Sequence, residues 1–98
     1  MKISKEVKNN QLIVTIVGQI DTGTCGEFEK TVMEQNLGLD IVCDFKDVSY
    51  VSSAGLRVIL SIYKSQKEIA KKLILLNVSN NILEVFKMTG FTEFLDIQ

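Results

Sequence analysis

Residues 43–60 read CDFKDVSYVSSAGLRVIL and place two serines, an alanine and a glycine directly before an apolar run. The residues just upstream, 39–45 (LDIVCDF), are mostly apolar, which predicts a buried strand. Downstream, residues 53–72 have apolar side chains at helical spacing and predict a helix of about 18 residues. A strand that passes into a helix through a serine- and glycine-containing loop is therefore the central unit of the predicted fold.

The segments before this unit predict a hairpin and a first helix. Residues 2–8 alternate polar and apolar side chains, as in a half-exposed strand, and the two asparagines at 9–10 tolerate the positive φ of a tight turn. Residues 11–20 (QLIVTIVGQI) are apolar on both faces, which predicts a strand covered on both sides. Residues 21–38 have apolar side chains at helical spacing and predict a helix that stops at Gly38.

The segments after the central unit add one strand and one helix. Residues 72–77 (KLILLN) predict another buried strand. Residues 79–90 predict a short helix, in which Asn81 and Glu84 have the spacing of a capping box. Residues 91–98 form a short terminal element.

This order of elements predicts the fold class. A hairpin followed by strand–helix–strand crossovers indicates an α/β protein with a mixed β-sheet, mostly parallel, and with helices packed on it. The chain has no proline, no internal repeat and no linker-like stretch. We therefore expect residues 1–98 to form a single domain.

Composition excludes several classes of partner. The 98 residues are 46% hydrophobic and 23% charged, as in ordinary globular proteins. The net charge is −1 without blocks of like charge, so there is no basic surface to attract nucleic acid or an anionic membrane. Apolar runs are short, whereas a bilayer crossing needs about 20 apolar residues. The start of the chain has no secretory pattern, so we expect a cytoplasmic protein.

The reactive side chains argue against an enzyme. The chain has no histidine, which removes Ser-His-Asp and Cys-His catalysis and imidazole metal sites. Cys25 and Cys43 are too few and too far apart for a metal site or a redox pair, and Cys43 has the sequence context of a small buried side chain. No phosphate-binding glycine motif is present. We expect no catalytic activity, no metal and no cofactor.

The predicted central helix has an unusually wide apolar face, of about 200°. Its extra edge, formed by Val58, Ile62 and Ile69, needs a neighbouring helix, the terminal segment or a partner to cover it. The opposite stripe is polar and contains Arg57 and Lys64, together with Ser61, Glu68 and Lys71. Ser53 projects onto this polar side, so its hydroxyl should face solvent.

Two interpretations of the serine pair remain open on physical grounds. A serine at a helix start can accept a hydrogen bond from an orphan amide, which contributes about 1 kcal/mol. That role needs only one of Ser52 and Ser53, so the other hydroxyl could serve as a functional acceptor. Gly55 is a poor residue for an early helical position. We interpret it as a place where a partner or a phosphate approaches the backbone closely.

Three segments in the right order resemble the STAS domain family, and more narrowly bacterial anti-sigma factor antagonists. The strand, loop and helix of residues 43–60 resemble the family signature. Residues 17–24 (VGQIDTGT) resemble the segment that follows the second strand of the family. Residues 82–97 (ILEVFKMTGFTEFLDI) resemble its third helix and terminal strand. The resemblance covers nearly the whole chain.

The resemblance implies a non-enzymatic switch. An unphosphorylated antagonist binds an anti-sigma factor, which typically is also a serine kinase and inactivates the antagonist by phosphorylating one serine. A PP2C-type phosphatase reverses the modification. By alignment this serine is Ser53, with Ser52 as second choice. The family often has an acidic residue where Ser52 stands and a hydroxyl residue where Ala54 stands.

The resemblance also implies a partner surface on the two loops that follow the second and third strands. Both loops come after strands whose carboxyl ends lie at one edge of the sheet, so we expect Asp21 and Asp47 near the serines. The alternative is a STAS subunit of another assembly, such as a lipid-transport ABC system, in which the same loop is a contact surface without phosphorylation. The expected partner contacts are Asp21, Thr22, Thr24, Ser52, Ser53, Ala54, Gly55, Leu56 and Arg57.

Overall fold

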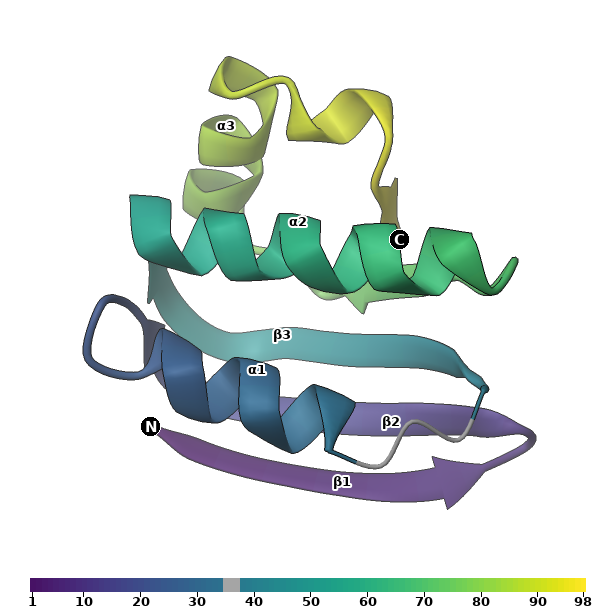
Figure 1. Cartoon of the computed structure of the whole chain (residues 1–98). Helices are drawn as coiled ribbons and strands as arrows, with labels where there is room; N and C mark the ends of the chain where they lie inside the picture. Colours follow the sequence, from purple (N-terminus) through teal and green to yellow (C-terminus); the bar gives the residue numbers. More distant parts are fainter. Residues whose placement is uncertain (35–37) are drawn as a thin grey trace.

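The computed structural model describes residues 1–34 and 38–98 as five strands, three α-helices and one short 3-10 helix (Figure 1). The strands are β1 (Lys2–Lys8), β2 (Gln11–Ile20), β3 (Asp40–Val51), β4 (Leu73–Leu76) and β5 (Asp96–Ile97). The helices are α1 (Cys25–Met33), α2 (Ser53–Glu68), α3 (Asn80–Met88) and the 3-10 helix η1 (Phe91–Glu93).

The five strands form one sheet in the order β1-β2-β3-β4-β5. β1 and β2 are antiparallel, and all other neighbours are parallel. Asn9 and Asn10 connect the antiparallel pair with φ values of 53° and 61°, the positive φ that a two-residue hairpin turn requires. The predicted mixed sheet and its hairpin are therefore confirmed.

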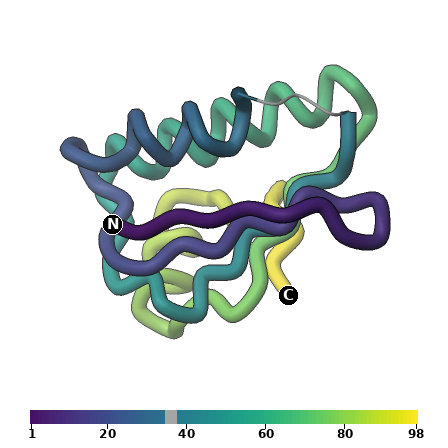
Figure 2. Tube along the Cα trace, turned by 90° about the horizontal axis from the view of Figure 1, so that it is seen from below, coloured from purple at the N-terminus to yellow at the C-terminus, as the bar shows by residue number. Residues whose placement is uncertain are grey.

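Two of the helices share one face of this sheet. α1 and α2 lie side by side on the same side of the strands (Figure 2). The buried side chains of α3, Ile82 and Phe86, belong to the same core cluster as those of the other two helices. Parallel strands that follow each other in chain order give this arrangement, because right-handed crossovers place α1 and α2 on the same face.

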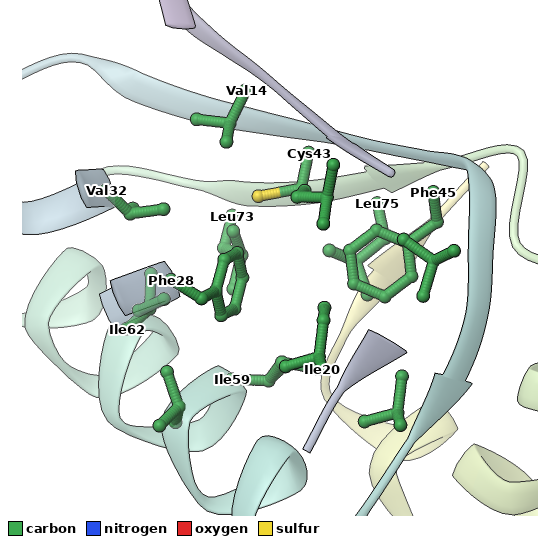
Figure 3. Packing of buried hydrophobic residues seen from close by; sticks show 14 of the residues in the cluster. Val14, Ile20, Phe28, Val32, Cys43, Phe45, Ile59, Ile62, Leu73 and Leu75 are labelled. Carbon is green, nitrogen blue, oxygen red and sulfur yellow. The ribbon is translucent and has the colours of Figure 1, made fainter. Parts of the chain in front are cut away.

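The core lies between that face and the helices. Side chains from the sheet, such as Cys43 and Leu75, point toward Phe28 of α1 and Ile62 of α2 (Figure 3). Val58 and Ile62 are buried, so the extra apolar edge of α2 is covered within the chain at these two positions. Ile69 lies beyond the end of α2 and is 41% exposed.

The one-sided arrangement corrects the interpretation of β2. Leu12, Val14 and Ile16 are buried as expected. The other face of the strand is not covered, because Ile13 is only half-buried and Val17 is 41% exposed. The apolar residues on that second face lie on the side of the sheet opposite to the helices.

β3 is longer than the predicted strand at residues 39–45. It continues to Val51 and pairs with β2 through two irregularities, at Thr15/Val17 and at Gly18/Gln19. The added half lacks a regular alternation, since Val48 and Val51 are buried and the residues between them are exposed. Such irregularities bend and twist a strand, and they let β3 run on to the start of α2.

The helix ends also differ from the predicted ones. α2 ends at Glu68 rather than near residue 72, and α1 ends at Met33 rather than at Gly38. The predicted stop at Gly38 follows residues 35–37, which lie outside the described residues. The predicted capping box of α3 is wrong as well: α3 begins after Ser79, whose hydroxyl accepts from the Ile82 amide. In the described part of the chain, no helix combines the length and the apolar character of a membrane span.

Candidate functional site

The ends of β2 and β3 meet the start of α2 at one edge of the sheet. Ile20 and Val51, the last residues of the two strands, are partners in the parallel register. The Ser52 amide donates to the Ile20 carbonyl at 2.9 Å. The 21–24 turn and the helix start therefore lie next to each other, as the sequence predicts for the two loops.

Ser52 is the N-cap of α2. Its backbone is extended (φ −84°, ψ 175°), and its hydroxyl accepts from the Gly55 amide at 3.2 Å. Its carbonyl accepts the first intrahelical bond, from the Leu56 amide at 2.9 Å. The amide, the hydroxyl and the carbonyl of Ser52 thus all form hydrogen bonds that fix the start of α2.

Ser53 is the first residue of α2 and is exposed. In the described part of the chain no hydrogen bond of its hydroxyl is found, so the oxygen is free to react or to bind. A helix start has four amides without an intrahelical acceptor. Ser52 and Gly55 have acceptors for theirs, which leaves the amides of Ser53 and Ala54 available to an anion.

The turn before α1, residues 21–24, is stabilised by hydrogen bonds between its own residues. The Asp21 carboxylate accepts from the amides of Gly23 at 2.9 Å and Thr24 at 3.2 Å. The Thr24 hydroxyl accepts from the Asp21 amide at 2.9 Å and lies 2.7 Å from the Gln19 carbonyl. Asp21 and Thr24 therefore shape the turn, whereas Thr22 is exposed and its side chain is open to a partner.

Asp47 does not lie at the site. Because β3 continues to Val51, Asp47 falls inside the strand, next to Val17 in register. It is exposed, four residues before the strand end. The expectation that Asp47 accompanies Asp21 at the serine loop is wrong.

Gly55 has an internal role rather than the expected one. A Cβ at this position would lie 2.6 Å from the Ile20 carbonyl oxygen and 3.0 Å from the side chains of Ile20 and Val51. Gly55 is needed because the first turn of α2 packs directly on the two strand ends. Gly55 and Leu56 are both buried, so they form the floor under the exposed residues of the loop.

An exposed cation follows Ser53 in α2, and an exposed aromatic ring lies near the end of β3. Arg57 is exposed one turn after Ser53, and none of the ion pairs found among the described residues involves it. Tyr50 is 53% exposed near the end of β3, beside Gln19 in register. Tyr50 lies within the quoted 43–60 stretch but is not among the partner contacts expected from the sequence.

The pKa shifts found among the described residues lie outside the serine loop. Among the described residues, no cluster of three or more His, Cys, Asp or Glu side chains could hold a metal ion. Burial raises the pKa of the Cys43 thiol to about 12, which makes this thiol inert. A hydrogen bond from Lys5 lowers the pKa of Glu34 at the far end of α1. Neither group lies at the serine loop.

The fold and the loop define a small α/β domain with an exposed serine, Ser53, at the start of α2. The STAS domain family model matches residues 2–98, and the chain belongs to this family.

The chain is similar in sequence to one named relative and in structure to two solved proteins. The anti-sigma-B factor antagonist of Bacillus subtilis is 35% identical over 99% of this chain and 92% of its own length. An anti-sigma factor antagonist from Mycobacterium paratuberculosis matches in structure with a TM-score of 0.86 at 16% identity, over 98% of this chain and 83% of its own. The phosphorylated form of the Bacillus cell fate determinant SpoIIAA matches with a TM-score of 0.76 at 20% identity, over 99% and 91%.

Proposed function

We propose that this protein is an anti-sigma factor antagonist, a binding protein without catalytic activity that Ser53 phosphorylation switches off. In the unphosphorylated state it sequesters an anti-sigma factor in the cytoplasm, which leaves the sigma factor free. The relative of this name from Bacillus subtilis, at 35% identity, supports the class of function. One observation carries the site assignment: among the described residues the exposed Ser53 hydroxyl has no hydrogen-bond partner, whereas the Ser52 hydroxyl is used by the helix cap.

The helix start can accept a phosphate without unfolding. A phosphoserine adds about −1.5 to −2 charges and three strong acceptor oxygens. At residue 53 these oxygens would meet the available amides of Ser53 and Ala54 and the positive end of the α2 dipole. The stability of the domain should therefore change little.

The phosphate would weaken binding of the partner rather than destabilise the domain. A surface that is neutral at the serine would become strongly negative where the anti-sigma factor packs. The exposed residues Thr22 and Arg57 lie on the two segments that meet at this position, and they are the side chains that we assign to direct contact. Asp21, Thr24, Gly55 and Leu56 support this surface from within, and Ser52 and Ala54 complete the loop.

The proposed switch needs three proteins. The anti-sigma factor itself would be the serine kinase, and a PP2C-type phosphatase would restore the active state. No nucleic acid and no membrane enters this scheme.

The test uses the full chain with ATP and the anti-sigma kinase encoded in the same genome. We expect mass spectrometry to find a single phosphate on the wild type and on Ser52→Ala, and none on Ser53→Ala. Phosphate on Ser52 in the wild type would contradict the assignment. Tight binding of the anti-sigma factor without any phosphorylation would indicate a contact surface only, as in STAS subunits of other assemblies.

A further inference from the structure

A recess lies at the end of α2 that is away from Ser53. It has a volume of about 260 Å³ and lies between the end of α2, the start of β4 and the C-terminal segment. Tyr63 lines it, ten residues after Ser53, which is about 15 Å along a helix. Figure 1 shows the C-terminal segment descending beside this half of α2. The recess is therefore separate from the proposed partner surface.

The walls of the recess are aromatic and aliphatic. The rings of Tyr63 and Phe94 have centroids 4.9 Å apart and are tilted by 49°. Phe94 also contacts Phe91, with centroids 5.1 Å apart, so its ring is supported from behind. Leu73, which is buried, contributes the aliphatic part of the lining. A flat apolar ligand could lie against these rings.

The rim of the recess is positively charged. Three lysines line it, Lys67, Lys71 and Lys72, and a single carboxylate, that of Asp96. None of the ion pairs found in the described residues involves these lysines. Lysines near a helix end do complement the helix dipole. That role does not require an apolar hollow between them, whereas a ligand with an apolar body and a negative group uses both features.

The loop that carries the rim is held firmly. Gln66 is 2% exposed, and its amide nitrogen donates to the carbonyls of Leu39 at 2.8 Å and Lys72 at 2.9 Å. The Lys72 amide donates to the Asp40 carboxylate at 2.9 Å. Ala70 takes the left-handed conformation (φ 56°) that closes the helix and lines the recess. A preformed site loses less conformational entropy when a ligand binds.

We propose that this recess binds a small aromatic carboxylate. The ring would lie against Tyr63 and Phe94, and the carboxylate would meet the ammonium groups of Lys67 and Lys71. The recess is slightly smaller than a typical drug-sized pocket, which fits a single-ring acid. The proposal does not depend on the partner of the serine loop.

The first test is a titration of the ¹⁵N-labelled full chain with phenylacetate, followed by NMR. We expect saturable shifts confined to residues 63–73 and 94–96. Phenylacetamide has the same ring without the charge, and inorganic phosphate has charge without a ring, so both should bind more weakly. Shifts spread over the surface, or no saturation, would overturn the proposal. Equal binding of either control compound would also overturn it.

The second test uses charge-removing variants. Lys67→Gln with Lys71→Gln should weaken phenylacetate binding about three- to tenfold, since an exposed charge pair contributes up to about 1 kcal/mol. Lys64→Gln is the matched control, because Lys64 is exposed on α2 but does not line the recess. An unchanged affinity in the double variant, or an equal loss in the control, would refute the role of the rim. Unchanged NMR shifts elsewhere check that each variant is folded.

Discussion

The Ser52 hydroxyl caps α2 by accepting from the Gly55 amide at 3.2 Å. The adjacent Ser53 takes no part in this cap and faces solvent. Two chemically equal serines therefore have different roles. Ser52 has a structural role, whereas the Ser53 hydroxyl is exposed and is not used by the cap.

Ser52→Ala should lower the free energy of unfolding by about 1 kcal/mol, because the Gly55 amide loses its acceptor. Ser53→Ala should change it by less than about 0.5 kcal/mol, as is usual for an exposed residue without such a bond. Urea denaturation of the two variants and the wild type measures both values. A larger loss for Ser53→Ala would show that Ser53 is the cap.

Ser53→Asp should weaken binding of the anti-sigma factor without lowering stability, since a carboxylate at a helix start is favourable. Isothermal titration calorimetry measures the affinity. Ser61→Asp is the control, because Ser61 is exposed two turns further along α2. Ser53→Ala should bind like the wild type. If Ser53→Asp also bound like the wild type, charge at residue 53 could not be the signal.

Arg57→Ala should weaken unphosphorylated binding by more than Lys64→Ala or Lys71→Ala. Arg57 is the only arginine in the chain and lies one turn after Ser53. Its planar guanidinium can form two parallel hydrogen bonds with a carboxylate of the partner, which a lysine cannot. Equal losses in all three variants would assign Arg57 to general surface charge.

Gly55→Ala should destabilise the fold by about 1–3 kcal/mol, because the new methyl group would overlap the Ile20 carbonyl at 2.6 Å. Gly26→Ala is the matched control. Gly26 lies in α1, and a Cβ there would contact nothing within 4 Å, so alanine should stabilise by up to about 1 kcal/mol. Thermal denaturation of both variants tests the pair. A harmless Gly55→Ala would mean that α2 does not pack on the strand ends as described.

Stability should fall with rising pH above about 9 because of Cys43. The folded state keeps this thiol protonated to a pKa of about 12, whereas in the unfolded chain the thiol ionises near pH 9. The unfolded state therefore loses its proton first, which favours unfolding by up to about 1.4 kcal/mol per pH unit. Urea denaturation at pH 8 and pH 10 should show a larger drop for the wild type than for Cys43→Val. Identical drops would place the Cys43 thiol in a hydrated environment.

Local patterns in the sequence predicted most of the elements. The two asparagines at 9–10 specify their turn through backbone preference alone, and the apolar run of β4 is unambiguous. The second half of β3 could not be found in this way, since Ser49 and Tyr50 are both exposed and break the alternation. The sequence predicts the wrong cap for α3, because Asn81 and Glu84 also have the spacing of a cap, and only the hydrogen bond of Ser79 distinguishes the two.

The candidate site was predictable in its residues but not in their roles. The sequence predicts that one of the two serines caps α2 and that the hydroxyl of the other is exposed. Which serine has which role depends on the backbone conformation of Ser52. Residue 55 has to be glycine because its backbone packs against Ile20, which lies 35 positions earlier in the chain. The recess at the end of α2 joins Tyr63 to Phe94, and no sequence pattern reports such a contact.

The order β1-β2-β3-β4-β5 means that every strand after β1 pairs with the strand before it in the chain. A ribosome releases these strands in the order in which the sheet can accept them. The hairpin can form first, and each later helix and strand extends one growing edge, so no strand has to wait for a partner that has not yet been synthesised. Each parallel pairing has to close only one crossover, from one strand to the next in the chain. The chain also lacks proline, so slow isomerisation of X–Pro bonds cannot delay this growth.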